Sequence, residues 1–405
     1  MKTTMEMTRT FHPVGQGAFY TERFDAYNRG TFTIVYDCGS TTLSKKVMGS
    51  KIKEALPEDS QIDILFISHF HADHINGIEA LKKHYKIKTV ILPLLSYEAK
   101  ILLKVAYYLD QKEESSSRLP YDQFEKLIDD PASFFGENET KVITIAPVEG
   151  EPHIQEGLPE AIDISQTTRG KTFASGIPLN PFQDINWFFI PFNYKQSERR
   201  KQFECAIERK GISLGDIDTI DKIASQKQLL RRAYNSIEGD LNENSMILFS
   251  GSIACRNTAH CMGKCLNLFH PRCHFYYCDH YSINYCNHGQ HRLEADSRIF
   301  QSGCLYLGDI NLNKGDLVED IGTRLKFFLP CLGTIQIPHH GSKHNFDNSI
   351  LKLGNIHFAV FSFGKKNRYG HPSASTVRDV VLSGPIPCAV TENLNSMVRQ
   401  LIGYW

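Results

Sequence analysis

The sequence predicts a layered α/β protein, because segments typical of strands alternate with segments typical of helices. Near the N-terminus the order is a strand at 31–36, a helix at 43–56, a strand at 61–68, a helix at 76–85 and a strand at 88–95. The segments TFTIVY and QIDILFIS are rich in β-branched and aromatic residues, and the second is a nearly continuous apolar run that indicates burial. The chain has 405 residues, and we expect a single domain over 1–405 that carries insertions.

The later elements follow from the same patterns. Apolar spacing predicts further helices over 97–111, 120–135, 216–237 and 373–382. Strands are predicted over 141–148, 187–192, 246–250, 304–307, 334–338, 357–363 and 389–392, the last being the final strand. Residues 149–186 are rich in Gly, Pro, Glu and Thr and are expected to form a long loop. We expect 95–240 as a whole to be a largely helical insertion or divergent region.

The charge balance excludes a global electrostatic argument for binding nucleic acid or an acidic membrane. Lys plus Arg and Asp plus Glu each number 45, so the formal net charge is zero and any basic surface must be local. No apolar run approaches the roughly 20 residues that a membrane helix needs. The first residues also lack the apolar core of a signal peptide. We therefore expect a cytoplasmic protein without membrane contact, and the sequence leaves its protein partners unknown.

The strongest chemical signal is the run His69-Phe70-His71-Ala72-Asp73-His74, directly after the buried strand at 61–68. Imidazole and carboxylate groups suit zinc, manganese or iron. In a loop that leaves a strand, His69 and His71 can hold one ion, while Asp73 and His74 on the next turn can hold a second beside it. Two adjacent metals can polarise a substrate oxygen and hold a hydroxide nucleophile at neutral pH. The alternative is a surface histidine cluster or a run of capping residues.

This motif resembles the HxHxDH hallmark of the metallo-β-lactamase superfamily, whose fold is an αββα sandwich. Asp37, after the strand at 31–36, resembles the early aspartate that supports the metal loop. Asp309 resembles the late strand-end aspartate that bridges two metals. His339 and His340 resemble the final ligand motif, with His340 favoured as the ligand and His339 beside it. The resemblance implies a four-layer αββα sandwich with helical and Cys-rich insertions, holding two divalent ions, zinc or manganese.

A narrower resemblance rests on short motifs that occur in one order along the chain. They are VGQG at 14–17, YDCG at 36–39, NSMIL at 244–248, PHHGS at 338–342 and NRYGHP at 367–372. Together they look like the soluble hydrolase domain of the competence DNA-internalisation channel protein. The likeness covers about 11–80, 243–250 and 303–376, and leaves out roughly 95–240 and 255–300. The channel's membrane segments are absent, so we expect a free-standing relative that hydrolyses phosphodiesters, with nucleic acid such as DNA, or another phosphodiester, as the substrate.

The sequence departs from the superfamily pattern at one ligand. Most members have a further His between HxHxDH and the late aspartate, whereas residues 242–245 here read Asn-Glu-Asn-Ser. Asn244 is therefore considered a supporting residue. The metal position of His69 and His71 is short of one protein ligand, which water, Asp309 or an Asn could replace. A preference for manganese over zinc, and operation with a single metal, both stay open.

The expected mechanism uses a metal-bound hydroxide that attacks phosphorus or carbonyl carbon. Asp73 or Asp309 would orient or deprotonate that water. His371 could contact a phosphate or act as a general acid, and a packed structural role is the alternative. Three basic residues precede it and could approach phosphates or simply be solvated: Lys365, Lys366 and Arg368.

A Cys- and His-rich insertion is predicted over 254–300, where the superfamily expects a short turn. Its cysteines are Cys255, Cys261, Cys265, Cys273, Cys278 and Cys286. Such density in a reducing compartment indicates a structural zinc site, although unpaired thiols without metal are the alternative and the ligand set is not assignable. The remaining five cysteines are expected to be small core or surface residues.

Three functions remain open on this evidence. The first is a metal-dependent phosphodiesterase or nuclease. The second is a thioester or lactone hydrolase on the same scaffold, which only the walls of the pocket would distinguish from the first. The third is a non-catalytic metal-binding interaction or effector module. Fold alone does not choose a substrate.

Overall fold

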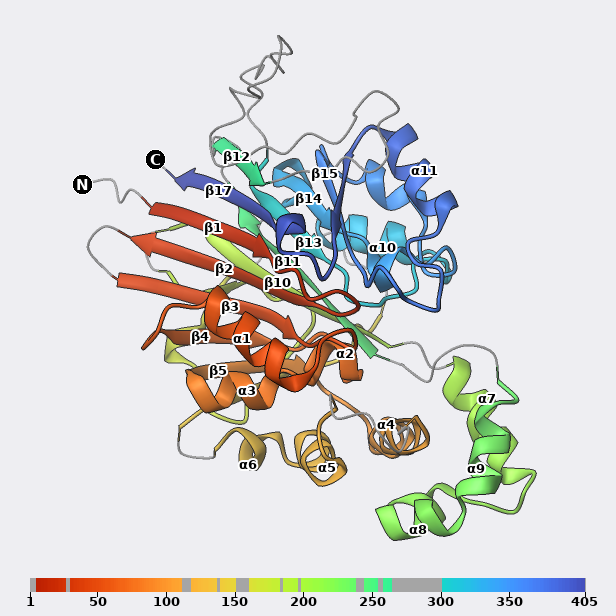
Figure 1. Ribbon diagram of the computed structural model, residues 1–405. Helices are drawn as coiled ribbons and strands as arrows, with labels where there is room; N and C mark the ends of the chain where they lie inside the picture. Colours follow the sequence, from red (N-terminus) through yellow and green to blue (C-terminus); the bar gives the residue numbers. More distant parts are fainter. Residues whose placement is uncertain are drawn as a thin grey trace.

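The computed structural model describes residues 5–26, 30–110, 118–136, 139–150, 160–182, 185–195, 198–237, 244–253, 258–263 and 301–404. Two large β-sheets pack face to face, and helices cover their outer faces (Figure 1). The predicted four-layer αββα sandwich is confirmed. Within the described ranges, no helix has the length and apolar character needed to cross a membrane.

Among the described residues, the first sheet has nine strands and contains the first and the last of them, β1 and β17. Its order is β12 (Thr258–Gly263), β17 (Val398–Tyr404), β1 (Met5–Phe11), β2 (Phe19–Ala26), β3 (Gly30–Cys38), β4 (Gln61–Phe66), β5 (Lys86–Pro93), β6 (Lys141–Ile145) and β8 (Thr172–Phe173). Pairing is antiparallel from β12 to β3 and parallel from β3 to β8. The parallel half is the β–α–β region that the sequence predicts.

The second sheet has eight strands. Its order is β16 (Ile386–Val390), β15 (Phe358–Ser362), β14 (Leu332–Gln336), β13 (Gly303–Tyr306), β11 (Asn244–Ser252), β10 (Trp187–Lys195), β9 (Leu179–Asn180) and β7 (Ile162–Asp163). Strands β13 to β16 run parallel, whereas β10, β11 and β13 are antiparallel neighbours. The carboxyl ends of the parallel strands of both sheets carry the predicted ligands.

Helices cover both outer faces (Figure 1). On the first sheet lie α1 (Lys45–Ala55), α3 (Ile78–His84), α4 (Tyr97–Leu109), α5 (Tyr121–Asp129) and α6 (Pro131–Phe135). On the second lie α10 (Leu317–Arg324) and α11 (Ala374–Ser383), with the short 3₁₀ turns η3 (Leu329–Cys331) and η5 (Asn348–Lys352). A small lobe of α7 (Glu198–Glu208), η2 (Leu214–Ile217), α8 (Ile220–Ser225) and α9 (Lys227–Tyr234) packs its own apolar cluster against α4.

Strand alternation assigns each apolar side chain to a layer. In β4, Leu65 joins the cluster under the helices, whereas its neighbours Ile64 and Phe66 point between the sheets. The space between the sheets is filled largely by aromatic rings, such as Tyr36, which stacks on Tyr306 with ring centroids 4.8 Å apart. This packing fixes the position of the strand ends of the first sheet relative to those of the second.

The structure corrects several predicted boundaries. The helix expected over 120–135 is divided, because Asp130 leaves helical geometry and its side chain caps the new helix at Ser133, with Pro131 in its first turn. The helix expected over 216–237 is divided at Gln226, and that expected over 76–85 begins earlier, as α2 (Ala72–Ile75) followed by α3. The 149–186 loop contains β7, β8, β9 and the turn η1 (Ile164–Gln166).

The sequence patterns also missed strands at both ends of the chain. β1, β2 and β17 were not predicted, so the expectation that 389–392 is the final strand is wrong. In β1 the apolar alternation that begins with Met5 and Met7 is interrupted by the buried Arg9, which hides the pattern of a core strand. The range 95–240 holds helices α4 to α9 and also strands β6 to β10. The side chains of the six cysteines predicted to bind zinc lie outside the described residues. The five cysteines elsewhere in the described chain carry free thiols.

Candidate metal centre

The predicted ligands converge where parallel strands of both sheets end. Asp37 lies at the end of β3, the HxHxDH run follows β4, Asp309 follows β13, and the histidine pair follows β14 in the turn η4 (Pro338–Gly341). Their donor atoms form two neighbouring groups, in each of which all atoms lie within 4.8 Å of one another. The first group is His69, His71 and Asp309; the second is Asp73, His74 and His340.

Asp37 supports the metal loop, as its position in the sequence predicts. Its carboxylate accepts hydrogen bonds from the backbone N–H of Ser68 at 2.7 Å, from the Ser68 hydroxyl at 2.6 Å and from Nδ1 of His74 at 2.8 Å. The Ser68 hydroxyl also lies 2.8 Å from Nδ1 of His69. Because the Nδ1 atoms of His69 and His74 are both hydrogen-bonded, their Nε2 atoms point to the centre. Metal-binding imidazoles are commonly oriented in this way, by a hydrogen bond to the ring nitrogen that does not bind the metal.

Asp309 lies between the two groups. Its Oδ2 is 3.5 Å from Nε2 of His69, and its Oδ1 is 3.3 Å from Nε2 of His74. Three atoms of this set are buried without a hydrogen-bond partner among the described residues: His69 Nε2, His74 Nε2 and Asp309 Oδ1. Two ligands of one tetrahedral ion, at bonds of about 2.0–2.1 Å, are separated by roughly 3.3 Å. The orphaned atoms and their spacing fit divalent ions, with the Asp309 carboxylate shared between two positions.

His340 fits the ligand role better than His339 does. Its Nδ1 donates to the carbonyl of Ser362 at 2.7 Å, which directs Nε2 towards Asp73, where it lies 3.0 Å from Oδ2. The His339 side chain is 30% exposed, and its Nε2 is 3.9 Å from Asp309. His339 therefore lies at the open side of the centre, where it can contact substrate.

The backbone is strained at this centre. Asp37, His339 and His340 have positive φ angles of 55°, 47° and 57°. Left-handed geometry costs a residue with a side chain on the order of 1 kcal/mol, and such strain collects at functional sites. Gly39 allows the backbone of Asp73 to approach the turn after β3 closely, because a Cβ on Gly39 would lie 2.5 Å from the carbonyl carbon of Asp73. The ligand backbone thus packs directly onto the YDCG turn.

Burial and mutual charge shift the pKa values of the ligands. Burial, together with the neighbouring His74, lowers the pKa of His69 to about 4, so its imidazole is neutral at pH 7, as metal binding requires. Burial opposes the shift of Asp309, but the positive charge of His74 holds its pKa well below the usual range. Burial likewise opposes the shift of His74, whose pKa the carboxylates of Asp309 and Asp37 raise. The anionic Asp309 attracts positive charge to the position between the groups.

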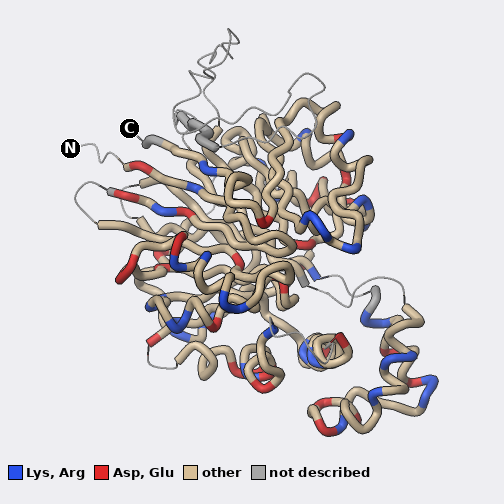
Figure 2. Tube along the Cα trace, viewed as in Figure 1, with Lys and Arg blue, Asp and Glu red and all other residues tan. Residues whose placement is uncertain are grey.

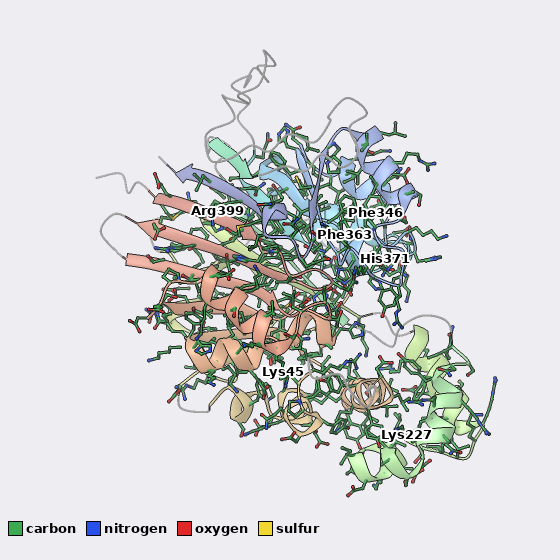
Figure 3. The ribbon with its side chains drawn as sticks, in the orientation of Figure 1. Lys45, Lys227, Phe346, Phe363, His371 and Arg399 are labelled. Carbon is green, nitrogen blue, oxygen red and sulfur yellow. The ribbon has the colours of Figure 1, made fainter. Side chains whose placement is uncertain are left out.

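His371 lies beside the centre rather than in either ligand group. It is half-buried, in the loop after β15, and its ring centroid is 5.6 Å from that of His339 (Figure 3). Burial, with the neighbouring His339 and His340, lowers the pKa of His371 to about 4. A neutral imidazole here can exchange hydrogen bonds with a substrate but carries no fixed charge. The side chain of Asn244, predicted to support the centre, lies outside the described residues, and its backbone begins β11.

The sequence reasoning missed residues that shape the centre without binding a metal. Ser68 joins Asp37 to His69, the Ser362 carbonyl orients His340, and Asn367 holds the loop that carries His371. The signal for Asn367 was present, because it begins the NRYGHP motif. Ser68 and Ser362 are ordinary strand-end residues, and only the assembled sheets show their partners.

Comparison with known proteins identifies the class of domain. Residues 26–159 match the family model described as the Metallo-beta-lactamase superfamily. No curated protein matches the chain. Residues 26–159 therefore match a superfamily whose members are generally metal-dependent hydrolases, which is the class of enzyme that the sequence predicts.

Three solved structures are similar in parts of their length. A long form RNase Z from yeast has 9% identity and a TM-score of 0.33, over 89% of this chain and 37% of its own. A mutant of the β-hydroxylase CmlA has 10% identity and a TM-score of 0.38, over 97% of this chain and 53% of its own. A subclass B3 metallo-β-lactamase from a soil metagenome library has 9% identity and a TM-score of 0.30, over 85% of this chain and 79% of its own.

Proposed function

We propose that this protein is a metal-dependent phosphodiesterase that acts on nucleic acid. The observation that carries the proposal is the position of Asp309, whose two carboxylate oxygens face the two adjacent ligand groups. Two adjacent divalent ions, when bound, would stabilise the attacking and the leaving oxygen of a phosphodiester displacement. The orphaned buried atoms of His69, His74 and Asp309 also favour an active centre over a vestigial one.

Side chains of the centre would orient the attacking water and contact the phosphate. Asp73 is the least buried of the predicted anionic ligands, with 16% of its side chain exposed, so its carboxylate is placed to orient an attacking water. His339 and His371 lie on the open side, where their ring nitrogens can hydrogen-bond to the phosphate or the leaving oxygen. The buried Asp37 keeps the ligand loop in position, and the buried His340 is itself placed as a ligand beside Asp73.

Local basic charge next to the centre favours a phosphate substrate over a thioester or lactone. Basic and acidic residues are interspersed along the described chain, in agreement with the zero net charge (Figure 2). In the loop before His371, however, three basic side chains are exposed: Lys365, Lys366 and Arg368. Cations at this place would contact the phosphates that flank the reacting one.

The motif resemblance to the competence channel hydrolase supports DNA as the nucleic acid. The motifs lie together in space around the centre. Gln16 of VGQG accepts a hydrogen bond from the backbone N–H of Gly364, just before the NRYGHP motif. A Cβ on Gly17 would lie 2.6 Å from the carbonyl oxygen of Asp73. The shared motifs thus have a common physical purpose, which is to hold the ligand loops against one another.

The test combines metal analysis with a substrate screen. The purified protein is supplied with manganese, zinc or magnesium and assayed on bis-p-nitrophenyl phosphate, single- and double-stranded DNA, RNA and a thioester. We expect phosphodiester cleavage, and a loss of about 10³-fold or more for Asp309→Ala with unchanged circular dichroism. Hydrolysis of the thioester alone would overturn the proposal, and so would full activity of Asp309→Ala.

The metal count must separate the centre from the predicted structural zinc. We propose that the insertion over 254–300 binds zinc through some of its cysteines, because thiolates at this density favour zinc. Substituting His71 and Asp309 together should remove the metal of the centre and leave any zinc bound by the insertion. The structural zinc would be refuted if this variant contained no zinc and all six cysteines of the insertion reacted with a thiol reagent.

A further inference from the structure

The loop 364–372, here called the NRYGHP loop, is held in one shape beside the metal centre. Asn367 makes four hydrogen bonds within it: its amide nitrogen donates to the carbonyls of Gly364 and His371, and its amide oxygen accepts from the backbone N–H groups of Tyr369 and His371. The loop is therefore ordered before any ligand arrives, and the ring it exposes lies at a defined place.

Tyr369 is the most exposed aromatic residue of the described chain, at 73%. Its ring is nearly parallel to that of His371, with an interplanar angle of 15° and centroids 5.8 Å apart. His371 in turn lies 5.6 Å from His339, whose Nε2 is 3.9 Å from the shared Asp309 carboxylate. A continuous series of rings thus leads from solvent to the metal centre.

Positive charge surrounds this series of rings. Lys365, Lys366 and Arg368 are exposed on the same loop. No carboxylate of the described residues lies within ion-pair distance of these three side chains, and Glu392 contacts only the backbone N–H of Lys365. An exposed aromatic ring among exposed cations, on a braced loop, has the composition of a surface that binds single-stranded nucleic acid.

We propose that Tyr369 is a stacking platform for an unpaired nucleobase next to the scissile phosphodiester, with the loop cations on neighbouring phosphates. This inference rests on the proposed function and names its substrate as single-stranded nucleic acid. In a duplex both faces of each base are already stacked, so the ring finds a base only where a strand is single or frayed. The His371 ring beneath Tyr369 sets the distance between the stacked base and the centre.

The test measures binding without turnover, by fluorescence anisotropy of labelled 12-nucleotide phosphorothioate DNA, which resists cleavage, with the metal-loaded protein. Two ligands are compared, a single strand with all its bases and one whose residues are abasic. We expect Tyr369→Ala to weaken binding of the base-containing strand about tenfold, Tyr369→Phe to restore it, and the abasic strand to bind both variants equally. Tyr97→Ala is the matched control, because Tyr97 is also exposed, at 59%, but begins α4 on the other sheet.

Two results with the single strands would overturn the inference. One is unchanged binding of the base-containing strand by Tyr369→Ala. The other is an equal loss for the abasic and the base-containing strand, which would indicate a disturbed loop or a role in phosphate binding. A duplex of the same sequence should bind wild-type protein and Tyr369→Ala with the same Kd, and a Tyr369-dependent preference for the duplex would also contradict it.

A failure of the stacking platform can be distinguished from a failure of the proposed phosphodiesterase function. Wild-type cleavage of bis-p-nitrophenyl phosphate tests the phosphodiesterase alone, and the anisotropy series tests the platform alone. Cleavage of the small diester together with Tyr369-independent binding would overturn only the platform. Base-dependent binding through Tyr369, with no diesterase activity under any of the metals, would support a single-strand site and overturn the enzyme.

Discussion

Two buried clusters of charge lie in this sandwich, and they differ in whether their polar atoms are satisfied. Between the sheets, Arg9 donates to Glu22 at 2.7 Å, to the Ser302 carbonyl at 2.9 Å and to Gln400 at 3.1 Å. Glu22 also accepts from the hydroxyl of Tyr306 at 2.9 Å. At the strand ends, by contrast, His69, His74 and Asp309 keep buried atoms without a hydrogen bond, and these residues face one another only at 3.3–3.5 Å.

The difference separates a structural cluster from a functional one. An isolated buried charge is costly, so folding favours a cluster in which each charge has its partners, as at Arg9. Unsatisfied donors and acceptors that point to one place persist when a ligand completes them. Burial and charge alone would have ranked the two clusters equally; the hydrogen bonds assign them different roles.

The largest expected effect breaks the functional cluster. His71→Ala or Asp73→Ala should each abolish hydrolysis, a loss of about 10³-fold or more, because each removes a predicted ligand. The fold should remain, since neither side chain is part of an apolar cluster. Steady-state rates and metal content by mass spectrometry are the measurements. Full activity in both variants would refute the assigned centre.

Breaking the cluster of Arg9 and Glu22 should lower stability and leave metal binding unchanged. Glu22→Ala leaves Arg9 charged and fully buried, which should lower the free energy of unfolding by about 3–5 kcal/mol. Urea unfolding of the metal-free protein measures it, and the metal content of the folded protein should not change.

Replacing both partners is the control for Glu22. Arg9→Met with Glu22→Leu removes both charges, and should recover at least half of the loss seen for Glu22→Ala. A double variant as unstable as Glu22→Ala would show that the hydrogen bonds of Tyr306 and its neighbours, rather than the unpaired guanidinium, dominate.

A smaller effect should follow from moving the metal loop without removing a ligand. A methyl group on Gly39 would lie 2.6 Å from the carbonyl carbon of His74, so Gly39→Ala should displace Asp73 and His74 and lower the rate about 100-fold. Gly49→Ala on α1 is the matched control, because its new Cβ would meet only Ala80, at 4.0 Å. Equal rates for the two variants would contradict the close packing of the loop.

The smallest expected effect concerns pH and a third buried group, His12. Burial, with Arg399 and Lys51 near it, lowers the pKa of His12 to about 3, against about 6.5 when the chain is unfolded. Between these values the unfolded state binds the extra proton, so stability falls as pH decreases from 6.5 towards 3, by about 1 kcal/mol per pH unit. Urea unfolding of metal-free protein at pH 7.5 and 5.5 measures this.

His12→Gln provides the comparison, since glutamine can keep the hydrogen bond to Thr21 but does not titrate. The variant should lose less stability on acidification than the wild type does. An identical pH dependence in both proteins would show that groups other than His12 control the acid response.

Much of the centre was predictable because its chemistry is local in sequence. HxHxDH places four donors within six residues after an apolar strand, and the strand itself follows from its composition. Asp309 and His340 were predicted only through their resemblance to a family pattern, since a single strand-end Asp or His carries no signal of its own. The strands β1 and β17 were missed because neither end of the chain shows a clean core pattern, and Arg9 contributes to this by being charged and buried.

The sequence by itself determined the class of fold, the metal-binding chemistry and the residues able to perform it, because periodicity and donor type depend on residues close together in the chain. Only the tertiary structure decided that Asp309 faces both ligand groups, that Ser68 and Ser362 orient the imidazoles, and that Tyr369 leads through His371 to the centre. The contacts of Asp309 join strand ends of two different sheets, and their distances are set by the packing between the sheets, whereas the other relations join neighbouring loops whose partners only the folded chain brings together.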